Sequence, residues 1–148
     1  MQLSYIFLAE SAITHEGKFF VFGGGLHRFQ STVFPCVIPT LALVAEISLE
    51  PGELGFPHAL IVRGIASDDS PFFPDVNADF TVDANPQHPE IRPIYMVAFN
   101  LRGAPLLGPG VYQFLLFVDG TEIGRVSFYA AMAPADSGEP SSLQERRD

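Results

Sequence analysis

The sequence predicts an all-β protein, a two-layer antiparallel β-sandwich of the immunoglobulin-like or C2-like kind with about eight or nine strands. Two observations lead to this fold class. First, 13 glycines and 13 prolines are spread along 148 residues, so few stretches are long enough for a three-turn helix. Second, the stretches between them are short runs rich in β-branched and aromatic residues, which favour strands.

The clearest strand is expected between residues 41 and 50, where apolar side chains recur at every second position. One face of this segment carries only apolar residues, namely Leu41, Leu43, Ala45, Ile47 and Leu49. The opposite face ends in the polar residues Glu46, Ser48 and Glu50. A period of two with polar alternates is typical of a half-buried strand. Residues 91–102 alternate in the same way, with Pro93 at the start of the strand or on an edge.

The strongest turn signal is Asp119-Gly120, which lies between two runs of strand-forming residues. Both positions tolerate the positive φ of a two-residue type I′ turn, so residues 111–129 are predicted to form a β-hairpin. Simple pairing across this turn sets Leu116 opposite Ile123 and Phe114 opposite Arg125.

A second hairpin is predicted near the N-terminus, where Leu3–Ala9 and Lys18–Phe22 flank Glu16-Gly17, with Gly17 as the left-handed residue. No helix breaker interrupts residues 3–14, so a helix is the alternative there, although Tyr5-Ile6-Phe7 favours a strand. Three further strands are expected, at Leu26–Phe29, Ala59–Ile65 and Ala78–Val82.

The charge of the chain excludes several classes of partner. Seventeen acidic residues face eight basic ones, which gives a formal net charge of −9. Binding to nucleic acid or to an anionic membrane requires clustered Lys and Arg, so neither is expected as a partner. The apolar content of 47% also excludes an intrinsically disordered chain.

The sequence predicts a soluble, cytoplasmic protein. No basic residue precedes the short apolar stretch Tyr5–Ala9, as a secretory signal would require, and no segment has the roughly 18 apolar residues of a membrane span. The single cysteine, Cys36, favours a reducing compartment. Residues 1–133 are expected to form the sandwich domain. Residues 134–148, with Leu143 as their one large apolar residue, are expected to form a disordered acidic tail.

Two groups of short motifs resemble those of a widespread bacterial family of uncharacterised β-sandwich proteins of similar length. The first group is Ala9-Glu10-Ser11-Ala12, Glu16-Gly17-Lys18 and Phe22-Gly23-Gly24-Gly25, and the second is the segment Pro109–Gly120. The resemblance covers residues 3–129. It implies a β-sandwich fold, and because the family has no assigned activity it implies no catalytic residue.

A cluster of acids between residues 68 and 83 is a candidate cation site. It contains Asp68, Asp69, Asp75, Asp79 and Asp83 together with two prolines, which suggests a rigid surface loop. Calcium prefers carboxylate and carbonyl oxygens, and Asp68, Asp69 and Asp75 are the expected ligands if this loop binds it. The alternative is a solvated acidic loop without a ligand, which is the preferred interpretation because the spacing of an EF-hand is absent.

Other chemical motifs are weaker. The residues after Gly23-Gly24-Gly25 are strand-like, so these glycines predict a bulge or a crossing between sheets and not a phosphate cradle. Cys36 has apolar neighbours and is expected to be a buried, inert thiol. The four histidines have no metal-ligand spacing, and no serine lies in a nucleophile motif. The sequence therefore predicts no catalytic residue and no cofactor.

Phe72 and Phe73, between Pro71 and Pro74, are the expected interaction residues. The prolines restrain them, and adjacent side chains of an extended chain point in opposite directions, so one ring is expected to be exposed. The predicted function is a non-enzymatic, cytoplasmic module that docks another protein or forms a homo-oligomer through a sheet edge. The alternatives are a β-sandwich that binds Ca²⁺ or a small ligand through residues 68–83 and, third, a hydrolase.

Overall fold

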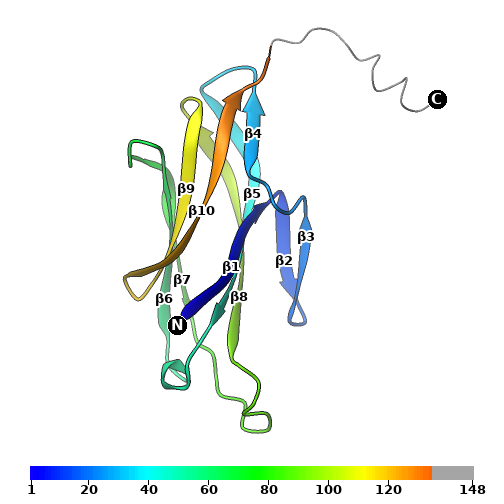
Figure 1. Ribbon diagram of the computed structural model, residues 1–148, viewed down its shortest axis with the longest axis vertical. Coiled ribbons are helices and arrows are strands. Elements are labelled where there is room, and N and C mark those ends of the chain that lie inside the picture. The colour runs from blue at the N-terminus through cyan, green and yellow to red at the C-terminus, as the bar shows by residue number, and fades with distance from the viewer. Residues whose placement is uncertain (135–148) are drawn as a thin grey trace, which may run out of the picture.

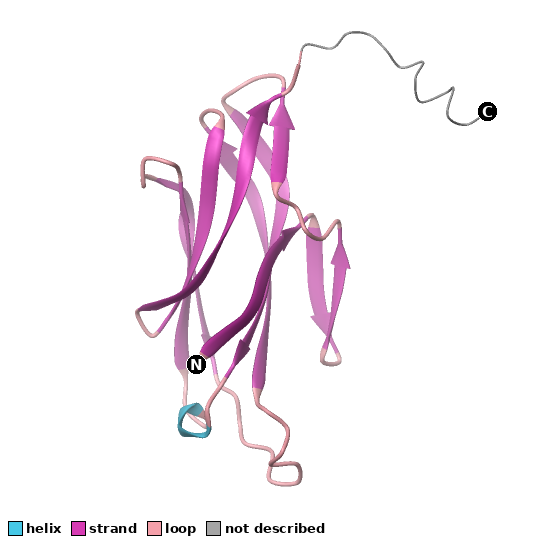
Figure 2. Ribbon diagram, in the orientation of Figure 1, coloured by secondary structure: helices cyan, strands magenta, loops and turns pink. Residues whose placement is uncertain are grey.

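The computed structural model describes residues 1–134. It contains ten strands and one 3₁₀ turn in that part of the chain, and it confirms the predicted all-β class (Figures 1 and 2). The strands are β1 (Gln2–Ala9), β2 (Ser11–His15), β3 (Lys18–Phe22), β4 (Arg28–Ser31), β5 (Cys36–Ser48), β6 (His58–Ile65), β7 (Pro71–Phe80), β8 (Ile94–Leu106), β9 (Gly110–Val118) and β10 (Thr121–Met132). The 3₁₀ turn is η1 (Pro51–Glu53). The predicted tail lies outside the described residues, apart from Pro134.

Two large sheets and one small one make up the fold. The three-stranded sheet has the order β1-β5-β8, the five-stranded sheet has the order β4-β10-β9-β6-β7, and β2 and β3 form a separate hairpin (Figure 1). Neighbouring strands are antiparallel except for β4 and β10, which are parallel. The predicted antiparallel sandwich is confirmed, and this one parallel pair departs from it. No helix in residues 1–134 is long and apolar enough to cross a membrane.

The parallel pair follows from the glycine segment after β3. Gly23 and Gly25 adopt φ values of 64° and 79°, which L side chains rarely adopt. The chain then passes β1, where the Leu26 N–H donates to the Leu8 carbonyl over 2.9 Å, and continues to β4 at the edge of the other sheet. This confirms the predicted crossing between sheets.

The core lies between the two large sheets. The apolar row of β5 that the alternation predicted is completely buried, and it packs with buried residues of the opposite sheet. The largest fully buried side chains of that opposite sheet are Phe114, Phe128, Leu60, Leu116 and Val62. β8 contributes Val97 and Leu101, which also confirms the row predicted there.

The predicted hairpin at Asp119-Gly120 is present, with φ values of 50° and 81° at the two turn residues. Its register differs from the expectation, because Leu116 pairs with Gly124 and not with Ile123. The same shift sets Phe114 opposite Val126. The cause is a β-bulge between Glu122 and Gly124, which adds one residue to β10 immediately after the turn.

The N-terminal segment is extended, as Tyr5-Ile6-Phe7 indicated, but it forms two strands with different partners. β1 pairs with β5, and the short strand β2 pairs with β3 across Glu16-Gly17, whose φ values are 52° and 71°. The predicted pairing of Leu3–Ala9 with Lys18–Phe22 is wrong. β1 ends before Glu10. The Glu10 N–H donates to the Phe22 carbonyl over 3.0 Å, which joins the start of β2 to the end of β3.

Residues 71–80 form strand β7, so the prediction of a rigid loop throughout 68–83 is wrong. β7 pairs with β6 and lies at the edge of the five-stranded sheet, where proline is tolerated because one side of the strand needs no partner. The strand expected at Ala78–Val82 is the last part of β7, which ends at Phe80.

We expect Gly64→Ala to lower the free energy of unfolding by about 1–3 kcal/mol, because overpacking a filled core forces side chains out of position. A Cβ at Gly64 would lie 2.8 Å from Phe72 Cε1 and 3.2 Å from Phe114 Cε1. Urea denaturation followed by circular dichroism measures the loss. The control is Gly52→Ala, where no atom lies within 4 Å, and it should change stability by no more than about 0.5 kcal/mol. Equal stability of the two variants would refute the packing at Gly64.

Candidate interaction site on the β2–β3 hairpin

The outer face of the three-stranded sheet is apolar and needs a cover. Ala42 and Val44 of β5 point away from the main core, yet both are completely buried. The cover is the β2–β3 hairpin, which contributes Ala12, together with Ala9 at the end of β1. Phe19 of β3 packs at the margin of this small second core. The small side chains of Ala9, Ala12 and Ala42 let the hairpin backbone approach the sheet closely.

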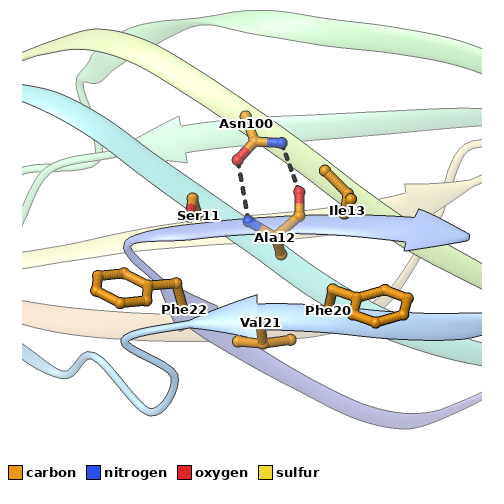
Figure 3. A pocket seen from close by; sticks show the side chains of 7 residues that line it. All are labelled: Ser11, Ala12, Ile13, Phe20, Val21, Phe22 and Asn100. Carbon is orange, nitrogen blue, oxygen red and sulfur yellow. Dashed lines mark hydrogen bonds between the residues drawn. The ribbon is translucent and has the colours of Figure 1, made fainter.

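Asn100 of β8 holds the hairpin on the sheet. Its Nδ2 donates to the Ala12 carbonyl over 2.7 Å, and its Oδ1 accepts from the Ala12 N–H over 3.2 Å (Figure 3). A side-chain amide carries the same donor and acceptor as a peptide group. Asn100 therefore takes the place of a neighbouring strand on the outer edge of β2.

The other face of the hairpin is apolar and exposed. Ile13 of β2 and Phe20 of β3 lie directly opposite each other and keep 59% and 53% of their surface accessible. Phe22, opposite Ser11 and on the same face as Phe20, is 69% exposed. We call these three residues, Ile13, Phe20 and Phe22, the hairpin patch. With Ser11, Ala12, Val21 and Asn100 they line a shallow hollow of about 510 Å³ (Figure 3).

β3 also has a free edge. Within residues 1–134 it pairs only with β2, and Figure 1 shows it as the outermost strand on its side of the molecule. Ala12 directs its N–H and C=O toward Asn100, so the pair Ala12–Val21 is one of the non-hydrogen-bonded pairs of the ladder. Val21 must then direct its own N–H and C=O away from β2. Phe19, two residues earlier, does the same, because the pattern repeats every second residue.

Phe72 and Phe73, the expected interaction residues, lie in strand β7 and are half-buried. The Phe72 ring packs against the rings of Tyr112 and Phe114, with centroids 4.9 and 5.3 Å away. Both phenylalanines contact the main core, because register shifts between β6 and β7 break the strict alternation that would expose one of them. Their predicted placement in an exposed loop is wrong.

The acidic residues of segment 68–83 have separate roles. Asp68 accepts hydrogen bonds from the Ser70 N–H and hydroxyl over 3.1 and 2.5 Å, which lowers its pKa. Asp69 is a turn residue with φ of 65°, and Asp75 forms an ion pair with Arg63 over 3.0 Å. In the described part of the chain, no group of three or more His, Cys, Asp or Glu side chains is arranged to hold a metal ion.

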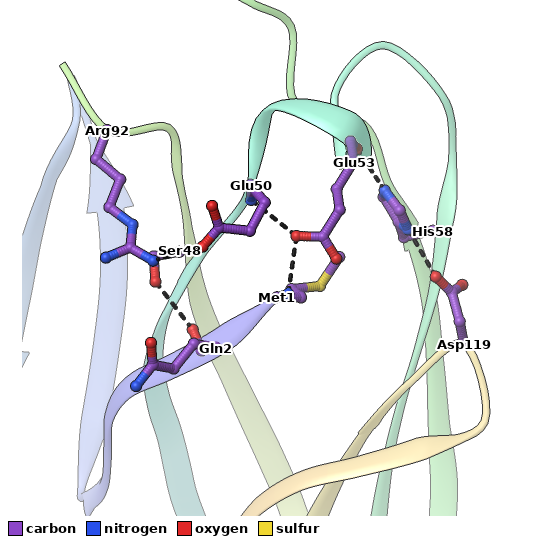
Figure 4. Close-up of polar contacts among 8 residues, drawn as sticks. All are labelled: Met1, Gln2, Ser48, Glu50, Glu53, His58, Arg92 and Asp119. Carbon is purple, nitrogen blue, oxygen red and sulfur yellow. Dashed lines mark hydrogen bonds and ion pairs between the residues drawn. The ribbon is translucent and has the colours of Figure 1, made fainter. Parts of the chain in front are cut away.

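Among residues 1–134, His58 is the one buried histidine, and both of its ring nitrogens have hydrogen-bond partners. Its ring is only 3% exposed, with Nδ1 2.6 Å from Asp119 Oδ2 and Nε2 2.6 Å from the Glu53 carbonyl (Figure 4). A carboxylate and a carbonyl both accept hydrogen bonds, so both contacts are satisfied when the ring is protonated and each ring nitrogen donates. The hydrogen bond to Asp119, followed by that to Glu53, raises the pKa of His58. The same contact, with a hydrogen bond from the Ala59 N–H, lowers the pKa of Asp119.

This pair is structural. An Asp–His pair also occurs in hydrolases, where the second ring nitrogen is free to act on a nucleophile. In this protein Nε2 is bound to the Glu53 carbonyl and the ring is buried, so the pair lacks that free nitrogen. Glu53 in turn contacts the Met1 amino group over 2.8 Å (Figure 4). The network therefore joins β6, the β9–β10 turn, η1 and the start of β1.

Cys36 of β5, expected to be buried, is only half-buried.

The His58–Asp119 pair should make stability depend on pH. The folded pKa of His58 is above its unfolded value, so its contribution is full below about pH 6.5 and is lost as the pH rises through the raised value. Asp119 has a lowered pKa, so its contribution is present above about pH 4 and is lost as the pH falls through that lowered value. The pair therefore stabilises the fold between the lowered pKa of Asp119 and the raised pKa of His58.

We expect Asp119→Asn to cost about 1–2 kcal/mol near pH 6, after allowance for the exposure of Asp119, and less near pH 9. Asparagine tolerates positive φ, so the turn itself is preserved. Urea denaturation at both pH values and NMR titration of His58 are the measurements. The control is His88→Gln, which removes an exposed histidine beside Glu90. It should change neither the stability at the two pH values nor the titration of His58. A His58 that titrates below its ordinary range would contradict this account.

Replacement of Asn100 should loosen the hairpin without unfolding the sandwich. Asn100→Leu removes both hydrogen bonds to Ala12, worth about 1 kcal/mol, which corresponds to roughly fivefold faster amide exchange in β2. Hydrogen exchange measured by NMR tests this. Asn77→Leu, at an exposed position of β7, is the control and should leave β2 unchanged. Unaltered exchange of Ala12 in Asn100→Leu would show that Asn100 does not hold the hairpin.

Comparison with known proteins gives one result that covers the whole sandwich. The model of a family of unknown function, DUF6941, matches residues 4–131, which extend from β1 to β10. A comparison with curated proteins produced no match. The match agrees with the resemblance to an uncharacterised β-sandwich family that the short motifs indicated. Because the match covers most of the 148 residues, the chain belongs to DUF6941, a family of unknown function.

Proposed function

We propose that the protein is a non-enzymatic, cytoplasmic interaction module that binds another protein chain through the β2–β3 hairpin. The observation that carries this proposal is the hairpin patch, where Ile13, Phe20 and Phe22 are each more than half exposed on one face. Exposed apolar side chains gathered on one face are typical of binding surfaces.

The way in which the hairpin is held on the sheet favours a role in recognition over a purely structural one. Its inner face is used to cover Ala42 and Val44, and its β2 edge is occupied by Asn100. One face and the β3 edge are left for another chain. A short, well-anchored hairpin loses little conformational freedom on binding, so more of the contact energy is available as affinity.

The net charge of the chain, the hydrogen bonds of His58 and the single cysteine also support this proposal. The net charge of −9 disfavours nucleic acid, so a protein partner fits an apolar patch on an acidic molecule better. A non-enzymatic role is supported by His58, whose ring nitrogens are both engaged in structural hydrogen bonds. A reducing, cytoplasmic location agrees with the single half-buried cysteine.

The test starts with the full chain as bait. Proteins that it retains are identified by mass spectrometry, purified, and titrated against the wild type, Phe22→Lys and Val111→Lys. Phe22→Lys places a charge in the hairpin patch and should weaken binding about tenfold or more. Val111 is 43% exposed on β9, so Val111→Lys is a matched control that should bind like the wild type. Equal binding of Phe22→Lys, or the absence of any bound chain, including a second copy of this one, would refute the proposal.

A further inference from the structure

We infer that the chain that occupies the β3 edge is β3 of a second copy, in an antiparallel pair related by a two-fold axis at Phe20. This inference rests on the proposed function of the hairpin and names its partner. It follows from the direction of the free peptide groups, the order of side chains along β3 and the position of the only lysine in the chain.

The free peptide groups fit a symmetric pair. The outward N–H and C=O groups belong to Phe19 and Val21, which lie one residue to either side of Phe20. When Phe20 of one copy lies opposite Phe20 of the other, Phe19 of each copy lies opposite Val21 of the other. Each such pair exchanges two hydrogen bonds, so the register forms four and uses every outward group of these two residues. A shift by one residue would set outward groups opposite inward ones.

The side chains fit the same register. The two Phe20 rings meet at a non-hydrogen-bonded pair, where opposite side chains are closest. Lys18 lies opposite Phe22 of the second copy, which allows an ammonium–aromatic contact. Ile13 extends the patch on both sides, because the two hairpins together form a four-stranded sheet with one apolar face.

The charges at the edge also permit a second copy. Lysines on edge strands usually discourage pairing, and Lys18 is the only lysine of the chain. In the Phe20-centred register it faces an aromatic ring and not its own counterpart. Residues 18–22 contain no acid, so no like charges lie directly opposite each other, although each chain carries a net charge of −9.

The dimer should be weak and should respond to salt. A five-residue strand covers less than the roughly 800 Å² per partner of a standard interface, which indicates a dissociation constant in the micromolar range. The net negative charge of each copy opposes association. Added salt screens this repulsion, so raising ionic strength should tighten the dimer several-fold.

Analytical ultracentrifugation of the full chain, from about 5 to 500 µM, is the first test. We expect a reversible monomer–dimer equilibrium that Val21→Pro and Phe20→Arg each weaken about tenfold or more. Val21→Pro removes one outward N–H, and proline is tolerated on an edge strand. Val111→Arg is the control and should dimerise like the wild type. Thermal melts confirm that every variant is folded.

Cross-linking then tests the register. In a Cys36→Ser background, Phe20→Cys should form a disulfide-linked dimer on mild oxidation, because the two thiols meet at the axis. The Val21→Cys side chain points to the opposite face and lies opposite Phe19, so this variant should form no disulfide-linked dimer. Cross-linking of Val21→Cys but not Phe20→Cys would overturn the register.

The outcomes separate this inference from the function on which it rests. A chain that is monomeric at about 500 µM, or a dimer unaffected by both Val21→Pro and Phe20→Arg, overturns the inference. If the chain is monomeric but a different protein binds in a manner sensitive to Phe22→Lys, the inference fails and the proposed function stands. If neither a second copy nor another protein binds, both fail.

Discussion

Strand β5 is buried on both faces, and this burial determines how the β2–β3 hairpin is placed. β5 presents its apolar row to the main core, and it presents Ala42 and Val44 to the outside of the sheet. Burying those two side chains requires a cover, and the β2–β3 hairpin provides it. Because a hairpin has two faces and two edges, covering the sheet with one face leaves the other face exposed. The hairpin patch and the free β3 edge are therefore consequences of how β5 is buried.

The polar contacts assign stability and recognition to different parts of the molecule. His58 and Asp119 hold β6 to the β9–β10 turn, and Asn100 holds the hairpin. Among residues 1–134, the buried side-chain polar atoms all have partners. The unpaired hydrogen-bonding groups that matter for association are main-chain groups of Phe19 and Val21. Strand pairing uses such groups directly, which is why a flat, short surface can recognise another chain without a deep pocket.

Local features were predictable and long-range partners were not. The apolar row of β5 and the turn at Asp119-Gly120 depend on neighbouring residues, and both are confirmed. The half-buried strand expected for β5 is wrong, because the β2–β3 hairpin also buries Ala42 and Val44 on its other face. The pairing of β1 with β5 joins segments far apart in the chain, and the β-bulge between Glu122 and Gly124 leaves no mark in composition. Prolines made β7 resemble a loop. The hairpin patch was missed because the run Phe19-Phe20-Val21-Phe22 is apolar throughout, and only the position of the sheet beneath it decides which rings are exposed.

We infer that the β3 edge is free in the single chain and is occupied by another β3 strand in solution. Amide hydrogen exchange of Phe19 and Val21, followed by NMR at increasing protein concentration, tests it most directly. We expect fast exchange of both amides in dilute solution and growing protection as the concentration rises, while Ala12 stays protected throughout by Asn100. Protection of Phe19 and Val21 equal to that of Ala12 at the lowest concentration would contradict the free edge. Exchange that stays fast at the highest concentration would contradict the pairing.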